Sequence, residues 1–211
     1  MSEIFSQEYF EFGAVTGKSL YENYRWLPNL TIPMAASIAA SLNLRQGSTV
    51  LDYGCAKGFL VKALRYLGYK AIGYDISTYA VTNADDEVRD LIFSDFTKIV
   101  QVCQRYDWII CKDVLEHVPC EQIKDVLANF KNMSVRSLVI VPLSRVSGGG
   151  YIAPEYDLDV THVIREPVEW WVDTFQSAGF RIDQLSYSMN GVKVAWFNKY
   201  PTANLFLTLS S

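Results

Sequence analysis

Long apolar runs, paired cysteines and clusters of basic residues are all scarce in this chain of 211 residues, and each scarcity excludes a class of protein. No apolar run approaches the ~20 residues that a membrane-spanning helix needs. The first ten residues, MSEIFSQEYF, carry acids and lack the apolar core of a signal peptide. The four cysteines form no Cys-x-x-Cys pair, which indicates buried thiols in a reducing compartment rather than disulfides or a zinc site. We therefore expect a cytoplasmic protein that does not bind membranes.

Positive charge is also in short supply. The 19 Lys and Arg residues are outnumbered by 23 Asp and Glu, and the net charge is −4. Proteins that bind nucleic acid neutralise phosphates with clustered Lys and Arg, so a nucleic-acid partner is disfavoured and a small-molecule substrate is expected. Half of the residues are hydrophobic and a fifth are charged, which is ordinary globular composition, and the length suits one domain.

From residue 49 onward, short apolar segments alternate with amphipathic ones. This rhythm of strand and helix predicts an α/β fold, in which a doubly wound and mostly parallel sheet carries helices on both faces. The expected strands are residues 49–53, 69–75, 91–94, 108–112 and 137–141, and helices are expected after Gly58, near 78–86, after Pro119 and after Pro167.

The two ends of the chain differ from this pattern. Residues 1–46 are rich in aromatics and include a predicted helix from its N-cap at Thr31 to about Leu44. These aromatics either pack against the main domain or form a lid over a ligand, and we treat 1–46 as an N-terminal helical cap. The main domain is expected to span 47–200, followed by a tail over 201–211.

A β-hairpin is predicted near the C-terminus. Residues 180–189 and 192–199 both look like strands, and the Asn190-Gly191 pair between them suits a type I′ turn. The hairpin would complete a seven-stranded sheet with an antiparallel end. The tail contains Leu205-Phe206-Leu207, which leaves packing on a neighbouring molecule, as in a homodimer, open.

The turn after the first expected strand carries the most informative motif. Residues 50–58 read VLDYGCAKG, and a dinucleotide fingerprint starting at Gly54 would need glycine where Ala56 and Phe59 stand. The pattern instead resembles motif I of class I S-adenosylmethionine-dependent methyltransferases, which has an acid and then glycines two residues apart. The resemblance implies that Asp52 meets the cofactor's ammonium indirectly and that the backbone at Gly54, Ala56 and Gly58 approaches its methionine part. Alanine at the middle glycine leaves less room and is best tolerated with a negative φ.

Acidic residues also follow the next two expected strands. Asp75 lies 23 residues after Asp52, close to the ~20-residue interval at which doubly wound folds place a ribose-binding acid. A carboxylate can accept hydrogen bonds from both ribose hydroxyls. In the family that the chain resembles, the position of Asp75 binds the ribose and that of Ile76 flanks the adenine. The segment after the third strand resembles the one in which Asp95 meets the adenine amino group and Phe96 stacks on the ring.

Residues 107–119, DWIICKDVLEHVP, resemble motif IV and the following motif of the small-molecule methyltransferase group. The resemblance implies that S-adenosyl-L-methionine is the cofactor and S-adenosyl-L-homocysteine the product. It also implies that Lys112, Asp113, Glu116 and His117 face the site. We expect methyl transfer to an oxygen or nitrogen of a small polar metabolite.

Two histidines, His117 and His162, are the only ones in the sequence, and both fall beside the expected crevice. Either has a pKa suited to a general base, and His162 is preferred because its loop would face the substrate. The candidate catalytic residues are therefore His162, His117 and Asp113. Positioning of the reactants can supply ~7–11 kcal/mol, whereas a base supplies a rate factor of roughly 10²–10⁴. Orientation should therefore matter more than the base.

Alternatives to this mechanism stay open. Asp113, Glu116, His117 and His162 could form a divalent metal site, because their spacing resembles the Glu-x-x-Glu-His of small-RNA 2′-O-methyltransferases and of some quinone-pathway O-methyltransferases. The Glu-His-Val-Pro sequence also occurs in methyltransferases without metal, and we assign no metal ligands. A non-catalytic cofactor-binding subunit is opposed by the intact segment 113–117. A nicotinamide oxidoreductase is opposed by Phe59 and the terminal hairpin.

The identity of the methyl acceptor is suggested only by analogy. The loop that follows the fifth expected strand is acidic and aromatic, and it contains Asp159-Val160-Thr161-His162. A helix with two adjacent tryptophans follows. Both features are similar to those of methyltransferases that act on sugars or other polar metabolites, so we expect an acceptor such as a sugar.

Overall fold

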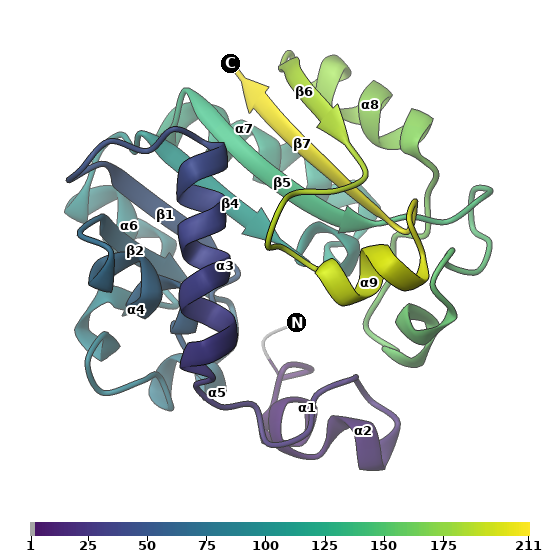
Figure 1. Ribbon diagram of the computed structural model, residues 1–211, viewed down its shortest axis with the longest axis horizontal. Coiled ribbons are helices and arrows are strands. Elements are labelled where there is room, and N and C mark those ends of the chain that lie inside the picture. The colour runs from purple at the N-terminus through teal and green to yellow at the C-terminus, as the bar shows by residue number, and fades with distance from the viewer. Residues whose placement is uncertain (1–2) are drawn as a thin grey trace.

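The computed structural model describes residues 3–211, and its apolar segments pair into a single sheet of seven strands (Figure 1). The strands are β1 (Thr49–Tyr53), β2 (Lys70–Tyr74), β3 (Ile92–Phe93), β4 (Trp108–Lys112), β5 (Arg136–Pro142), β6 (Arg181–Ser186) and β7 (Asn204–Ser210). The helices are α1 (Gln7–Glu11), α2 (Gly13–Thr16), α3 (Pro28–Ser41), α4 (Phe59–Tyr66), α5 (Thr78–Thr82), α6 (Phe96–Val102), α7 (Ile123–Met133), α8 (Val168–Ser177) and α9 (Val194–Lys199). Short 3₁₀ turns cover Arg89–Leu91, Leu115–His117, Cys120–Gln122 and Pro154–Leu158.

The strand order is β3-β2-β1-β4-β5-β7-β6. β1 pairs in parallel with β2 and β4, and β4 pairs in parallel with β5. β7 is antiparallel to both of its neighbours, β5 and β6. The predicted fold class, a doubly wound and mostly parallel sheet with an antiparallel C-terminal hairpin, is confirmed.

Side chains that alternate along the central strands divide between two cores. Val50 and Ile110 pack with α3 and α4 on one face, whereas Leu51 and Ile109 pack with α6, α7 and α8 on the other. Alternation of this kind follows from the two-residue period of a strand, and burial of both faces is usual for parallel sheets. The two layers of helices hold the sheet rigidly and leave the ends of the strands for the site.

The N-terminal segment before α3 lies against the loops that follow β1 and β2. Lys57, after β1, pairs with Glu11 of α1, and the Ser77 hydroxyl, after β2, donates to the Phe5 carbonyl. The helix α3 begins at Pro28 rather than after Thr31. Proline suits the first position of a helix, because its fixed φ is close to the helical value. α3 packs on α4.

The predicted position of the last strand is wrong. Residues 194–199 form the helix α9, and the strand that pairs with β6 is β7, which lies in the expected tail. A strand buried between two neighbours is apolar on both faces, so β7 lacks the alternation that would identify it. Gly191 adopts a positive φ but Asn190 does not, so the expected type I′ turn, which needs both, is not formed. A Cβ on Gly191 would lie 2.1 Å from the Ser37 hydroxyl, so this turn packs close to α3.

The apolar residues of the expected tail are buried in the core of this chain. Leu205, Phe206 and Leu207 are 0%, 4% and 0% exposed, so they offer no surface to a neighbouring molecule and do not support a homodimer. Among the helices of residues 3–211, none is long and apolar enough to cross a membrane.

Candidate functional site

The carboxylate of Asp75, directly after β2, is held by the backbone around it. Oδ2 accepts a hydrogen bond of 2.7 Å from the Ala56 N–H, and Oδ1 accepts one of 2.8 Å from the Ser77 N–H. Each oxygen has two lone pairs, so both can accept a further hydrogen bond. Burial raises the pKa of Asp75 to about 6, although these two N–H groups oppose the rise.

The turn after β1 brings bare backbone next to this acid. Gly54 and Gly58 both have φ near +80°, and a Cβ on Gly54 would lie 2.2 Å from Val114. Ala56 has a φ of +49°, so it occupies the left-handed region in spite of its Cβ. This conformation costs an alanine roughly 1–2 kcal/mol. The Ala56 side chain packs against the aromatic cluster of Tyr9 and Phe10, which provides contacts that a glycine would lack.

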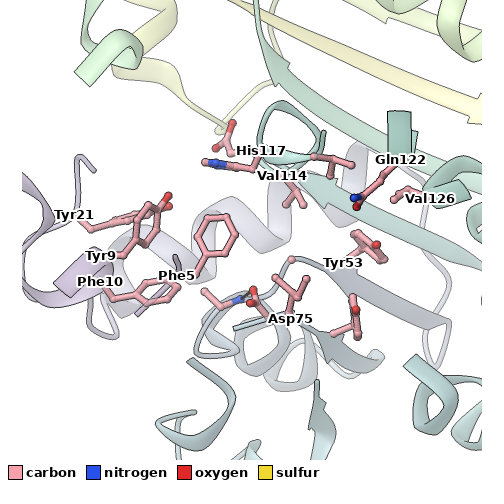
Figure 2. Close-up of a pocket in the computed structure, with 16 residues that line it drawn as sticks. Phe5, Tyr9, Phe10, Tyr21, Tyr53, Asp75, Val114, His117, Gln122 and Val126 are labelled. Carbon is pink, nitrogen blue, oxygen red and sulfur yellow. Dashed lines mark hydrogen bonds between the residues drawn. The ribbon is translucent and has the colours of Figure 1, made fainter. Parts of the chain in front are cut away.

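A cavity of about 250 Å³ opens above these loops, and we call it the cofactor pocket. Asp75 lies on one side, His117 lies across from it, and Phe5 projects between them (Figure 2). Ile76 also lines the cavity. Among the described residues, Asp95 and Phe96 line neither this cavity nor the one beside it. Asp95 instead caps α6 through the Thr97 N–H, and the Phe96 ring packs edge-on against Tyr74, which does line the pocket.

Two further expected cofactor residues lie near the pocket without lining it. Asp52 is buried in β1, where desolvation raises its pKa to about 7 against the opposing charge of Lys112. Gly58 begins α4, and a Cβ there would meet Ile92 at 2.8 Å. Lys112 lines the neighbouring cavity. Of the residues that the sequence assigns to the cofactor, four line the cofactor pocket: Gly54, Ala56, Asp75 and Ile76. The others, Asp52, Gly58, Lys112, Asp95 and Phe96, do not line it.

The neighbouring cavity, of about 540 Å³, we call the acceptor pocket. Four residues line both pockets: Tyr9, Tyr21, Asp113 and His117. The rest of its lining comes from Leu20, α3, the end of β4 and the segment after it, the loop after β5, and α9 with the turn before it. His162 and Glu116 line this pocket but not the cofactor pocket. A ligand in one pocket would thus contact a ligand in the other beside His117.

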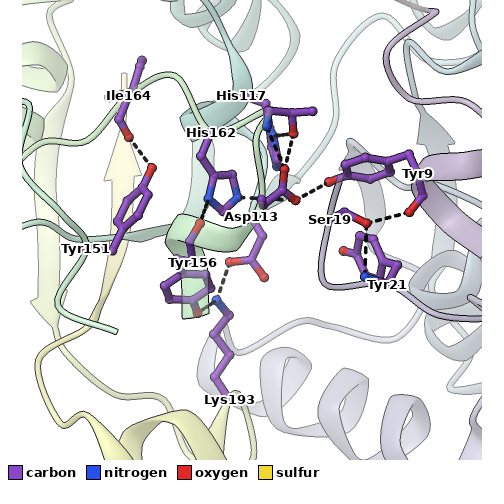
Figure 3. A network of polar contacts seen from close by, with 12 residues as sticks. Tyr9, Ser19, Tyr21, Asp113, His117, Tyr151, Tyr156, His162, Ile164 and Lys193 are labelled. Carbon is purple, nitrogen blue, oxygen red and sulfur yellow. Dashed lines mark hydrogen bonds and ion pairs between the residues drawn. The ribbon is translucent and has the colours of Figure 1, made fainter. Parts of the chain in front are cut away.

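Asp113 stands at this junction as a permanently charged group. Its φ is +56°, and its two oxygens pair with the amines of Lys112 and Lys193, each at 2.5 Å. Burial disfavours the carboxylate, but the two lysines outweigh it and hold the pKa of Asp113 well below its usual range. Asp113 is therefore a poor base. Lys193 also donates to the Tyr156 hydroxyl (Figure 3). A further hydrogen bond joins Lys193 to Asn204, and no sequence signal marked this lysine.

Glu116 is the least satisfied group in the site. Its side chain is completely buried, and neither carboxylate oxygen has a hydrogen-bond partner within residues 3–211. Burial, with the charge of Asp113 nearby, raises its pKa well above the usual value. A buried carboxyl group without partners costs a fold several kcal/mol, on the order of 2–7, relative to a hydrogen-bonded one. Such a group indicates a ligand.

The two histidines complete this polar end of the acceptor pocket. Their ring centres are 4.6 Å apart, and in both rings Nδ1 is engaged by the protein. The Nδ1 atom of His117 is 2.8 Å from the Thr161 hydroxyl, and that of His162 is 2.8 Å from the Tyr156 carbonyl (Figure 3). Glu116, His117 and His162 each offer one ligand atom within 4.8 Å of the others, a grouping from which Asp113 is absent.

A doubly wound sheet with this strand order, a glycine turn after β1 and an acid at the end of β2 defines the class I methyltransferases that use S-adenosylmethionine. The sequence model of the methyltransferase-domain family matches residues 33–185, more than half of the chain. The chain therefore belongs to this methyltransferase-domain family.

Two curated relatives are both named as O-methyltransferases, and each matches only part of this chain. The ubiquinone biosynthesis O-methyltransferase of Paraburkholderia phytofirmans is 35% identical over 80 residues, which are 35% of this chain and 34% of that one. The magnesium-protoporphyrin O-methyltransferase of Synechocystis is 29% identical over 113 residues, 51% of this chain and 49% of that one. The chain thus matches from a third to a half of the length of these curated relatives.

Solved structures show the same fold at lower identity. A methyltransferase from Archaeoglobus fulgidus superposes with a TM-score of 0.61 at 17% identity, over 84% of this chain and 92% of that one. The Synechocystis magnesium protoporphyrin IX methyltransferase, solved with bound S-adenosylmethionine, superposes with a TM-score of 0.55 at 18% identity, over 85% of this chain and 78% of that one.

If Asp75 binds the cofactor ribose, its raised pKa should make cofactor affinity depend on pH. Only the carboxylate form accepts two ribose hydroxyls, and this form is lost as the pH falls through about 6. The dissociation constant of S-adenosylhomocysteine, measured by calorimetry, should therefore be about tenfold higher at pH 5 than at pH 7. The Asp75→Asn variant should bind weakly at both pH values. An equal pH dependence in this variant would exclude Asp75 as the titrating group.

Proposed function

We propose that this methyltransferase transfers its methyl group to an oxygen or nitrogen of a small polar metabolite, such as a sugar, held in the acceptor pocket. When bound, S-adenosylmethionine supplies an electrophilic methyl group on a sulfonium, and S-adenosylhomocysteine is the product. The observation that carries the proposal is the orphaned Glu116 carboxyl at the polar end of that pocket. The names of the curated relatives, both O-methyltransferases, favour oxygen over nitrogen.

Hydrogen-bond accounting supports an acceptor with several hydroxyl groups. Glu116 and the Nε2 atoms of His117 and His162 can all accept hydrogen bonds, while the amines of Lys112 and Lys193 are engaged with Asp113. A ligand with neighbouring hydroxyls would supply the missing donors, and buried groups without donors would reject an analogue that lacks them. Above this end, Trp196 stacks on Tyr156 with ring centres 4.5 Å apart, which provides an apolar wall.

His117, rather than His162, is the group that we propose to contact the reacting hydroxyl, because His117 alone of the two lines both pockets. Burial, together with the neighbouring His162, lowers the pKa of His117 to about 4, so the ring is neutral at pH 7. Its Nε2 accepts the hydroxyl hydrogen bond and so aims an oxygen lone pair. As the new carbon–oxygen bond forms, the oxygen becomes positively charged and releases its proton to Nε2.

In this mechanism, positioning of the reactants contributes more to the rate enhancement than proton acceptance does. Holding the hydroxyl at the junction of the two pockets can lower the barrier by ~7–11 kcal/mol. Proton acceptance by His117 adds a rate factor of roughly 10²–10⁴. Its low pKa places His117 toward the weaker end of that range, because a base is most effective near the working pH.

A labelled methyl donor and a panel of acceptors test the proposal. We expect label to pass to at least one monosaccharide or nucleotide-linked sugar, and the Asp75→Asn variant should lose this transfer. Phenols and simple amines are the matched comparison acceptors. Methylation of phenols or amines with none of the sugars would contradict the proposed acceptor class.

A metal-assisted O-methyltransferase is the second candidate function, and one observation favours it. Glu116, His117 and His162 converge with three free ligand atoms, and the Nδ1 atom of each ring is already engaged by the protein. Protein metal sites usually hold their histidines in this way. The residues therefore fit a divalent cation, which would polarise the acceptor hydroxyl. Asp113 does not belong to this set, because two lysines occupy it.

Metal removal separates the two candidates. If a cation takes part, EDTA treatment should abolish turnover, and added Mn²⁺ or Mg²⁺ should restore it. Binding of Mn²⁺ alone, followed by electron paramagnetic resonance, should weaken about tenfold or more in the Glu116→Gln variant. Full turnover in EDTA, with no Mn²⁺ bound by the wild-type protein, would exclude the metal.

A further inference from the structure

The carboxylate of Asp159, in the loop after β5, accepts hydrogen bonds from the distant Tyr9 and from the nearby Thr161. Its Oδ2 accepts from the Tyr9 hydroxyl at 2.9 Å, across 150 residues of sequence. Its Oδ1 accepts from the Thr161 hydroxyl at 2.6 Å and from the Thr161 N–H at 2.9 Å. Asp159 is only 4% exposed, so these protein groups replace the water around it.

The Thr161 hydroxyl links this carboxylate to His117. A hydroxyl carries one proton, and that of Thr161 is committed to Asp159. The Nδ1 atom of His117 lies 2.8 Å from the same oxygen, so it must be the donor in that contact. Because a neutral imidazole has one N–H, Nε2 is then left with a free lone pair. This is the atom available to a ligand at the junction of the two pockets.

We propose that Asp159 and Thr161 are positioning residues, which fix His117 in the Nδ1–H tautomer and so direct its Nε2 lone pair at the acceptor. In this arrangement the Thr161 hydroxyl lies between the Asp159 carboxylate and the His117 ring. Thr161 would have no such role if the carboxylate contacted the ring directly. Tyr9 lines both pockets and binds the other oxygen of Asp159, so the N-terminal segment belongs to the same network.

His162 provides an internal reference for this network, because its Nε2 lies 3.9 Å from the Asp159 Oδ2, which is too far for a hydrogen bond. Its Nδ1 donates to the Tyr156 carbonyl, a backbone group that side-chain substitution does not remove. Both rings are therefore expected in the Nδ1–H form, for different reasons. A change at Thr161 should act on the tautomer of His117 and leave that of His162 as it is.

Nitrogen-15 NMR of the histidine rings tests the positioning role without any acceptor. The metal-free wild-type protein should show the Nδ1–H form for both rings, with His162→Gln used to assign the signals. Thr161→Val keeps the shape of the side chain and removes the hydroxyl, so His117 should shift toward the Nε2–H form or a mixture. Thr161→Ser should restore the wild-type spectrum. An unchanged His117 signal in Thr161→Val would overturn the proposal.

Turnover then measures what the tautomer contributes, and this part rests on the proposed function. Thr161→Val should lower kcat by roughly 10–100-fold, less than the roughly 10²–10⁴-fold that full loss of a base would cost, and should leave the affinity for S-adenosylhomocysteine unchanged. Thr161→Ser should recover kcat to within about threefold of wild type. Equal losses in the valine and serine variants, or wild-type kcat in Thr161→Val, would overturn the positioning role. If the wild-type protein methylates none of the acceptors, the proposed function fails, and the NMR result still decides the tautomer.

Discussion

The parallel pairing of β1 with β2 and β4 is the constraint on which the site depends. In this register Tyr53 lies opposite Tyr74 on one side and Cys111 on the other, so the three strands end at the same level. The glycine turn, Asp75 and the segment from Lys112 onward therefore emerge side by side. The hydrogen bond from the Ala56 N–H to Asp75 then joins two of these loops directly. A slip of one residue in the pairing of β1 with β2 would turn Asp75 to the other face of the sheet.

Two buried carboxyl groups show how differently the fold treats charge. Asp113 has two lysine partners, and the attraction outweighs the loss of hydration. Glu116, three residues later, has no partner for either oxygen and lies beside two neutral histidines. Native folds satisfy nearly all of their buried polar groups, and exceptions gather where a ligand completes the structure. The acceptor pocket is such a place, whether hydroxyl groups or a cation supply the missing contacts.

Local signals in the sequence sufficed for the parallel half of the fold and for Asp75, because each strand there ends in a turn with its own residue signature. They failed for β7, since a strand buried between two others shows no alternation, and residues 192–199 fit a helix as well as a strand. Asp95 and Phe96 follow the expected strand, but Asp95 caps the N-terminus of α6 and Phe96 packs on Tyr74. Lys193 could not be foreseen, because its partner is 80 residues away in sequence.

The central claim is that Asp75 binds the cofactor in one pocket and that His117 stands where this pocket borders the acceptor pocket, since it lines both. A crystal structure of the protein with S-adenosylhomocysteine tests it most directly. The account predicts that the ribose hydroxyls lie within hydrogen-bond distance of the Asp75 carboxylate and that the sulfur faces the junction lined by His117 and Asp113. A nucleoside bound with its ribose away from Asp75, or with its sulfur turned from that junction, would contradict the account.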